Sequence, residues 1–312
     1  MKIRGLLIAT VAAAGMLGFS ASAMAADYAI VLKTLSNPFW VQMKDGIEAK
    51  AKELGVEVDI VASPSEEDFQ SQLQLFEDML NRDYKGFGFA PLSPVNLVNP
   101  AAAAYKKGKP IVNIDEKVDM KALEAAGANV EAFVTTDNVK VGEKGAKFII
   151  EKLGAEGGEV AIVEGKAGNA SGQARHDGAK AAFEATSNVK LVASQPADWD
   201  RLKALDVATN ILQSSPDLKA FYCANDTMAL GVMQAVQNAG KAGKVLVVGT
   251  DGAPEAREMV AAGRLTATVA QDPAKVGATS LELLVNAVKA GKLTPVGTEP
   301  KFVAVDSVLV TK

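Results

Sequence analysis

Short apolar runs alternate with amphipathic stretches along the chain from about residue 28 onwards. The runs are four to six residues long, many are rich in Val and Ile, and they centre on Ile30, Val58, Phe87, Val112, Val134, Ile162, Val192, Phe221, Val247, Val269 and Val303. Near-continuous apolar runs of this length are typical of parallel strands that are covered on both faces. The stretches between them have helical spacing, so the pattern predicts an α/β fold with doubly wound parallel sheets.

The stretch after the first run contains a clear helix start. Asn37 is a preferred N-cap residue, and Pro38 is favoured at the first helical position. The apolar positions that follow keep helical intervals: Val41, Ile47, Ala51 and Leu54. Gly55 is the predicted stop of this helix.

The number of runs favours two lobes over one sheet or one barrel. Eleven predicted strands are more than a closed eight-unit barrel contains. The composition of the sequence also changes at residues 117–131, which are rich in Ala, Gly and charged residues. A fresh strand–helix cycle begins after this segment. We therefore expect two lobes of five or six strands each.

The N-terminus has the three parts of a secretory signal peptide. Lys2 and Arg4 are followed by an apolar stretch over residues 6–19 and by small residues before Ala26. This predicts a cleaved signal peptide over residues 1–25 and export to the periplasm. No later run reaches membrane-spanning length, so membrane insertion is not expected.

Composition excludes several classes of function. Removal of Lys2 and Arg4 changes the formal charge from −4 to −6, which gives no electrostatic basis for binding nucleic acid. Cys223 is the only cysteine and is expected to pack as a small hydrophobe. With His176 as the only histidine, expected at a solvated or ligand-rim position, little material remains for a transition-metal site, and no cofactor is predicted.

Two further segments have plain interpretations. The glycine-containing segment 165–172 matches neither phosphate-binding spacing, so we interpret it as a strand-to-helix turn. The acidic segment 66–68 is interpreted as the solvated first turn of a helix, where acids favour the helix dipole.

Polar side chains follow the ends of several predicted strands: Lys33, Asn37, Asp115, Glu116, Asn225, Asp226, Asp251 and Gln271. Ligands of α/β sheets bind at the carboxyl ends of the strands, and carboxylates and amides suit hydroxyl groups. For Asn37 the alternative is a cap alone, for Asp251 a turn, and for Phe39 a core position. One of Asn225 and Asp226 is expected to cap a helix and the other to face the ligand.

Both tryptophans, Trp40 and Trp199, stand at loop-to-helix junctions in a chain that is only 5% aromatic. Two flat apolar faces beside amides and carboxylates suit a ring that is apolar on its faces and hydroxylated at its edge. The strand-tip residues and the indoles together favour a sugar ligand.

Five segments resemble periplasmic sugar-binding proteins of the ribose/allose cluster: 37–40, 194–201, 224–229, 248–252 and 270–271. The resemblance runs over essentially the whole mature chain. It implies two Rossmann-like lobes joined by a three-segment hinge, with the ligand in the cleft between them. The implied N-terminal lobe comprises residues 26–136 plus 272–300, and the C-terminal lobe residues 137–271 plus 301–312.

The resemblance also implies a site and a role. The substrate-binding residues carried over by motif are Asn37, Phe39, Trp40, Asp115, Trp199, Asn225 and Asp251, with Gln271 at the hinge. Lys33 and Asp177, which depart from the ribose-binding pattern, are also predicted to bind the substrate. The implied role is the substrate-binding component of an ABC importer, a monomer that traps a monosaccharide such as D-allose and delivers it to an inner-membrane permease. It is not an enzyme.

Three positions depart from the ribose-binding pattern. Those proteins carry arginine where this chain has Glu116 and again, just before Gly178, where it has Asp177, and they lack a basic residue at Lys33. This predicts a site that has lost two cations and gained one.

Three other functions are compatible with parts of this pattern. An exported carbohydrate-active enzyme could use Asp115 and Asp251 as its carboxylate pair. The effector lobe of a transcription repressor is disfavoured by the signal peptide and by the lack of a basic helix-turn-helix segment. A sugar receptor for chemotaxis, with a chemoreceptor as partner, is not separable from a transport protein by sequence.

Overall fold

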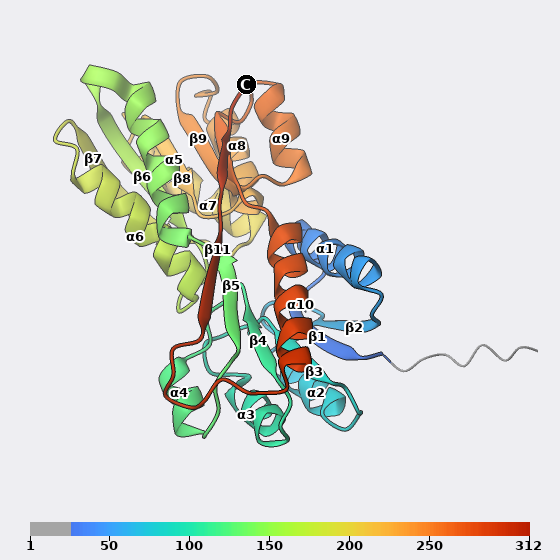
Figure 1. Ribbon diagram of the computed structural model, residues 1–312. Helices are drawn as coiled ribbons and strands as arrows, with labels where there is room; N and C mark the ends of the chain where they lie inside the picture. Colours follow the sequence, from blue (N-terminus) through green and yellow to red (C-terminus); the bar gives the residue numbers. More distant parts are fainter. Residues whose placement is uncertain (1–25) are drawn as a thin grey trace, which may run out of the picture.

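The computed structural model describes residues 26–312 and contains two α/β lobes, one above the other in Figure 1. The first lobe has a six-stranded sheet in the order β11-β5-β4-β3-β1-β2, and all its strand pairs are parallel. Its strands are β1 (Tyr28–Thr34), β2 (Val58–Ser63), β3 (Gly86–Phe89), β4 (Ile111–Ile114), β5 (Ala132–Thr136) and β11 (Lys301–Val305). Its helices are α1 (Pro38–Leu54), α2 (Phe69–Met79), α3 (Val98–Lys106), α4 (Met120–Ala125) and α10 (Pro273–Ala290).

The second lobe repeats this architecture, with the strand order β12-β10-β9-β8-β6-β7. Its strands are β6 (Gly158–Glu164), β7 (Val189–Pro196), β8 (Ala220–Cys223), β9 (Leu246–Asp251), β10 (Ala267–Ala270) and β12 (Val308–Val310), of which only β12 runs antiparallel to its neighbour. Its helices are α5 (Asn138–Leu153), the short 3₁₀ helix η1 (Gly154–Glu156), α6 (Ala170–Glu184), α7 (Arg201–Ser214), α8 (Asp226–Asn238) and α9 (Pro254–Ala261). The predicted two-lobed doubly wound fold is confirmed.

Each sheet is buried on both faces, as the apolar runs predict. In β1, Ile30 and Leu32 pack against the face covered by α1 and α10, whereas Ala29 and Val31 pack against the opposite face. Side chains alternate along a strand, so a strand covered on both sides must be apolar throughout.

The predicted start and end of α1 are also confirmed. The Asn37 side chain accepts a hydrogen bond from the Phe39 backbone N–H, and Pro38 is the first helical residue. Gly55 ends the helix in the left-handed conformation, with φ 66°. This fixes Phe39 and Trp40 in the first turn, at the carboxyl end of β1.

The chain changes lobe three times. It crosses after β5, again between β10 and α10, and a third time between β11 and β12. The third crossing differs from the expected boundary at residue 300, because Lys301–Val305 pairs in parallel with the open edge of β5 and belongs to the first sheet. Figure 1 shows β11 running beside β5 toward the second lobe.

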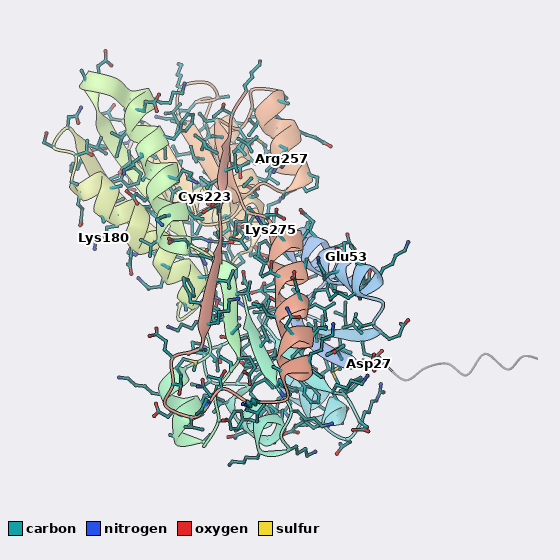
Figure 2. All side chains as sticks on the ribbon, viewed as in Figure 1. Asp27, Glu53, Lys180, Cys223, Arg257 and Lys275 are labelled. Atoms are coloured by element: carbon teal, nitrogen blue, oxygen red, sulfur yellow. The ribbon has the colours of Figure 1, made fainter. Side chains whose placement is uncertain are left out.

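Other predictions from the sequence concern Cys223, segment 165–172 and membrane insertion. Cys223 is fully buried in the core of the second lobe (Figure 2), and segment 165–172 is the turn from β6 into α6. Within residues 26–312, no helix is long and apolar enough to cross a membrane. The predicted signal peptide over residues 1–25 lies outside the described residues.

Candidate ligand-binding site between the lobes

The carboxyl ends of the two sheets face each other across a cavity, which we call the interlobe cavity. Each lobe contributes six residues to its lining. They are Lys33, Asn37, Phe39, Trp40, Glu66 and Asp115 from the first lobe, and Asn169, Ser171, Arg175, Trp199, Asn225 and Asp251 from the second. Eight of the ten predicted site residues are therefore brought together by the fold.

Aromatic rings from both lobes contribute to the wall. In the first lobe, Phe39 and Trp40 lie in an edge-to-face arrangement with centroids 5.1 Å apart. The Trp40 indole Nε1–H donates to Glu66 Oε1 at 3.1 Å, which fixes the plane of the ring.

Trp199 from the second lobe is fixed by glycines. Its backbone has φ 65°, an uncommon conformation for a bulky residue. A Cβ at Gly165 would lie 2.0 Å from the indole, and one at Gly172 would lie 3.0 Å from it. The Arg175 guanidinium lies 5.9 Å from the ring centroid. The chain therefore accepts backbone strain to hold this indole against the cavity.

Asp115 follows β4 with φ 58°, and within residues 26–312 its buried Oδ1 has no hydrogen-bond partner. Burial raises the pKa of Asp115 to about 6, although Lys33 and Arg175 oppose the rise. A buried carboxylate oxygen without a donor is rare and points to an acceptor reserved for a ligand. The turn that carries it is held by Asn113, which accepts from the Val118 backbone N–H and donates to the Glu116 carbonyl.

Asp251 is the matching acid of the second lobe. Its Oδ1 accepts from Arg175 Nη1 at 3.3 Å and from Gln271 Nε2 at 2.6 Å. Burial raises its pKa, and Arg175 opposes the rise. Because one oxygen takes both intramolecular bonds that the described residues offer, the other can accept from a ligand.

The two amides perform two roles each. Asn37 and Asn225 use Oδ1 to cap α1 and α8, at 3.0 Å from the Phe39 N–H and 2.8 Å from the Met228 N–H. Their NH₂ groups are left to donate into the cavity. Asn225 therefore serves as both cap and lining residue, whereas Asp226 lies buried in the second lobe and accepts from Thr268 Oγ1 at 2.7 Å.

Each lobe also supplies a buried cation. Lys33 Nζ lies 3.3 Å from Glu116 Oε2 and 5.5 Å from the Trp40 ring centroid. Burial lowers the pKa of Lys33, but Glu116, Glu66 and Asp115 outweigh that effect and leave the pKa above its ordinary value. Arg175 is 5% exposed and also donates to the Ala224 carbonyl at 2.7 Å.

Two predicted site residues lie outside the cavity lining. Asp177 is exposed on α6, where it contacts His176 and Gln173, so its predicted role at the site is wrong. Residues three apart on a helix are near neighbours, but Arg175 and Asp177 are two apart and point in different directions. Gln271 is buried and holds Asp251 instead of lining the cavity itself.

The cation that the ribose-binding pattern has at position 177 is absent here, but another residue of α6 supplies a cation to the cavity. Arg175 lies three residues before Gly178 and two residues before Asp177, the position considered from sequence, and it lines the cavity. His176 sits beside Glu164 and Asp177, outside the cavity lining.

The sequence interpretation missed Arg175, Glu66, Asn169 and Ser171. Segment 66–68 divides: Asp68 caps α2, but Glu66 lines the cavity and binds Trp40. Asn169 and Ser171 lie at the start of α6, directly after β6. Their place at the carboxyl end of a strand was the signal that could have identified them as lining residues.

The fold and the site together define a class. Two α/β lobes joined by three crossovers enclose a cavity with aromatic wall residues and a set of balanced donors and acceptors. Residues 26–312 contain no group of three or more His, Cys, Asp or Glu side chains that could hold a metal ion. The molecule is a two-lobed binding protein for a small polar ligand.

Comparison with known proteins identifies the family. A model described as periplasmic binding protein domain matches residues 28–293. The chain is 71% identical to the D-allose-binding periplasmic protein of Escherichia coli strain K12, over 95% of each chain. It is 38% identical to the ribose import binding protein RbsB of Haemophilus influenzae, over 84% of this chain and 85% of that one.

Among solved structures, an ABC transporter periplasmic solute-binding protein from Actinobacillus succinogenes with bound D-allose matches with a TM-score of 0.84 at 35% identity. The match covers 91% of this chain and 96% of that one. The chain belongs to the periplasmic binding protein family. It is a binding protein, not an enzyme, so the carbohydrate-active alternative does not apply.

Proposed function

We propose that the interlobe cavity binds a single monosaccharide, with D-allose as its principal ligand. The observation that carries the proposal is the buried Asp115 Oδ1, to which residues 26–312 offer no hydrogen-bond donor, in a cavity that Trp40 of one lobe and Trp199 of the other also line. A sugar hydroxyl would satisfy this acceptor, while the apolar faces of the sugar ring pack against the indoles.

The polar lining suits a neutral, many-hydroxyl ligand. Asp115 and Asp251 accept, the Asn37 and Asn225 amides donate, and Lys33 and Arg175 neutralise the acids. Each cation already lies against a carboxylate of the protein, so a negatively charged ligand is not favoured. The choice of D-allose is supported by the 71% identical relative and by the D-allose-bound structure.

Calorimetric titration tests this proposal. D-Allose should bind with a Kd of about micromolar or tighter, roughly −8 kcal/mol or more favourable. Trp199→Ala should weaken binding by at least about 2 kcal/mol, which is about thirtyfold, as expected for a buried aromatic anchor. An exposed change far from the cavity, Lys180→Ala, serves as the matched control and should leave the Kd unchanged.

The titration should include D-ribose and other neutral hexoses and pentoses. Absence of heat with every neutral monosaccharide would contradict the proposal. An unchanged Kd in Trp199→Ala would mean that the indole only packs within its lobe.

We further propose that the chain acts as a monomer and delivers its sugar to an inner-membrane ABC permease. One chain supplies lining residues from both of its lobes, so the proposed site does not require a second copy. Light scattering after gel filtration should give the mass of one chain, and a dimer would contradict this. The mass of the exported protein should equal that of a chain that begins at Ala26, which would establish cleavage of residues 1–25.

Transport and chemotaxis need a cellular test. Deletion of the protein should abolish uptake of labelled D-allose into cells. Normal uptake together with a lost swarm response to the sugar would instead favour the chemoreceptor as the partner.

A further inference from the structure

Glu116 bonds to the opposite lobe across the cleft, in addition to its ion pair with Lys33 in its own lobe. It follows Asp115 after β4 of the first lobe, and its side chain is fully buried. Its Oε2 accepts from Asn169 Nδ2 at 2.7 Å and from Ser171 Oγ at 2.9 Å, and its Oε1 accepts from the Ala170 backbone N–H at 2.5 Å. All three donors belong to the second lobe.

The donors are the N-terminus of α6. This helix is 15 residues long, and its first backbone N–H groups have no partner within the helix. The positive end of the helix dipole and these free donors favour a carboxylate. Glu116 therefore caps a helix of the opposite lobe, a bond that exists only while the lobes are together.

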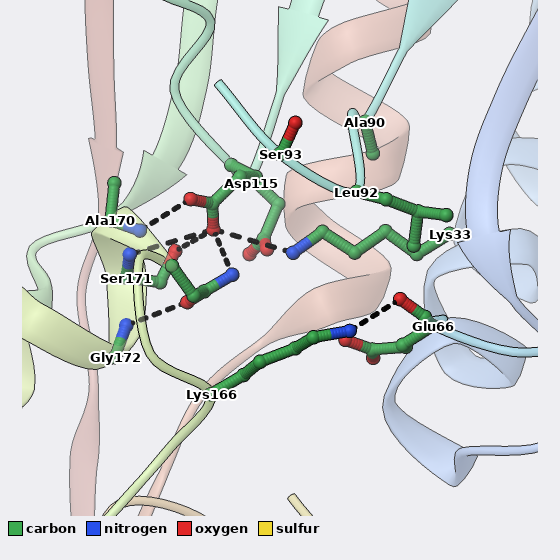
Figure 3. A network of polar contacts seen from close by, with 12 residues as sticks. Lys33, Glu66, Ala90, Leu92, Ser93, Asp115, Lys166, Ala170, Ser171 and Gly172 are labelled. Carbon is green, nitrogen blue, oxygen red and sulfur yellow. Dashed lines mark hydrogen bonds and ion pairs between the residues drawn. The ribbon is translucent and has the colours of Figure 1, made fainter. Parts of the chain in front are cut away.

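The same carboxylate holds the sugar site on its own side. Lys33 Nζ lies 3.3 Å from Glu116 Oε2 and lines the interlobe cavity. In Figure 3, Lys33 from one side and Ser171 from the other point into one cluster of dashed contacts. A second contact across the cleft, from Lys166 Nζ to the Glu66 carbonyl at 2.8 Å, lies nearby and is also drawn there.

We propose that Glu116 is an interlobe clasp: it stabilises the closed arrangement without needing a sugar, and it positions Lys33 for the ligand. Separation of the lobes returns the carboxylate to Lys33 and water and removes three donors at once. Hinge closure around a ligand is a motion for which periplasmic binding proteins are a known example. A clasp that favours closure raises the apparent affinity for the sugar, because a larger fraction of the protein is already closed before the sugar binds.

The chemistry of the partners makes the charge essential. Asn169, Ser171, Ala170 and Lys33 all donate to Glu116, so a carboxylate satisfies them and an amide does not. Glu116→Gln would turn an NH₂ group toward donors. This change keeps the volume of the side chain and removes only its capacity to accept at both ends.

The test measures lobe separation without sugar. Cysteines introduced at the exposed Val95 and Leu202, one in each lobe, carry spin labels for pulsed electron resonance distances. Cys223 is fully buried and burial raises its thiol pKa, so it stays unlabelled. Glu116→Gln should shift the sugar-free distances toward longer values, and Ser171→Ala should shift them the same way by less.

Glu131→Gln is the matched control. Its carboxylate also accepts a backbone N–H, that of Thr294, but within the first lobe, so its distances should equal those of the unmodified chain. Circular dichroism checks that each variant is folded. If Glu116→Gln does not fold, the distances of Ser171→Ala decide the test. A sugar-free distance distribution that both variants share with the unmodified chain would overturn the clasp.

The positioning of Lys33 rests on the proposed function and is tested separately. With D-allose at saturation, Glu116→Gln should recover the short distance, with a Kd at least about threefold weaker. An unchanged Kd would overturn the role in positioning Lys33. If no sugar binds the unmodified chain, the proposed function fails, but the sugar-free distances still decide on the clasp.

Discussion

Backbone strain in this molecule is concentrated at ligand-facing residues. Four non-glycine residues have positive φ, namely Asp115, Asp198, Trp199 and Asp251, among those that the structure describes. Three of the four line the interlobe cavity. Such conformations cost about 1–3 kcal/mol each and persist where the surroundings impose them. The fold thus loses some stability in order to direct Asp115, Asp251 and Trp199 toward the cavity.

The protonation of Asp115 leads to a pH prediction. Its raised pKa, about 6, leaves it ionised at pH 7.5 and mostly protonated at pH 5. The ionised form accepts more hydrogen bonds, so sugar affinity should fall as pH drops through 6. At pH 5, about a tenth of the sites would be ionised, and the Kd for D-allose should be about tenfold higher than at pH 7.5.

Calorimetry at the two pH values checks this prediction. Burial also raises the pKa of Asp251, so the loss can be steeper than one proton would give. The Asp115→Asn variant should bind more weakly at pH 7.5 and show a shallower pH dependence. A Kd that is flat from pH 7.5 to pH 5 in the unmodified chain would rule out an ionised Asp115 as the acceptor.

Sequence patterns located strand tips well and helix faces poorly. Asp115, Asn225 and Asp251 were predictable because the end of a strand fixes where the next side chains lie. Arg175 and Asp177 are only two residues apart on one helix, and the packing of α6 on α5 decides which of them faces the cavity. Charge and neighbouring sequence do not encode that rotation.

At the scale of elements, the second lobe depends on the close approach of α5 and α6. A Cβ at Gly142 would lie 1.9 Å from the Arg175 carbonyl oxygen, and one at Gly178 would lie 2.1 Å from the Val139 carbonyl oxygen. The two glycines thus face each other's helix. Because α6 and its N-cap supply Asn169, Ser171 and Arg175, this spacing sets the position of three of the five polar residues that the second lobe contributes to the lining.

Gly142→Ala should therefore affect both stability and binding. The added methyl forces the helices apart, which should destabilise the protein by about 1–3 kcal/mol, as overpacking does. Thermal unfolding measures the first effect and D-allose titration the second, where weaker binding is expected. Lys147→Ala on the same helix removes only an exposed ion pair and should change stability by less than about 0.5 kcal/mol. A Gly142→Ala protein as stable as this control would show that the helices can separate freely.

The strands were largely predictable from the sequence, whereas the points at which the chain crosses between the lobes were less so. All eleven predicted apolar runs fall on strands, because burial on both faces leaves a continuous signal. The three-residue β12 was not predicted, and β11 was assigned to the wrong lobe. Both are edge strands, and the edge on which a strand pairs is decided by which sheet offers unpaired backbone groups.

At the scale of the whole molecule, function depends on two lobes that meet around the ligand. Trp40 and Trp199, the only two tryptophans, lie on opposite sides of the cleft and both line the cavity. The clasp at Glu116 adds a direct bond between the lobes beside the sugar. One ligand must contact both lobes, since only then does binding favour closure.

Intrinsic fluorescence can report whether one sugar contacts both tryptophans. Trp40→Phe and Trp199→Phe each leave a single indole, one per lobe, and retain an aromatic wall. On titration with D-allose, both variants should show a saturable change in emission whose midpoint agrees with calorimetry. Emission that stays constant in either variant while the sugar binds would contradict a ligand held between the two tryptophans.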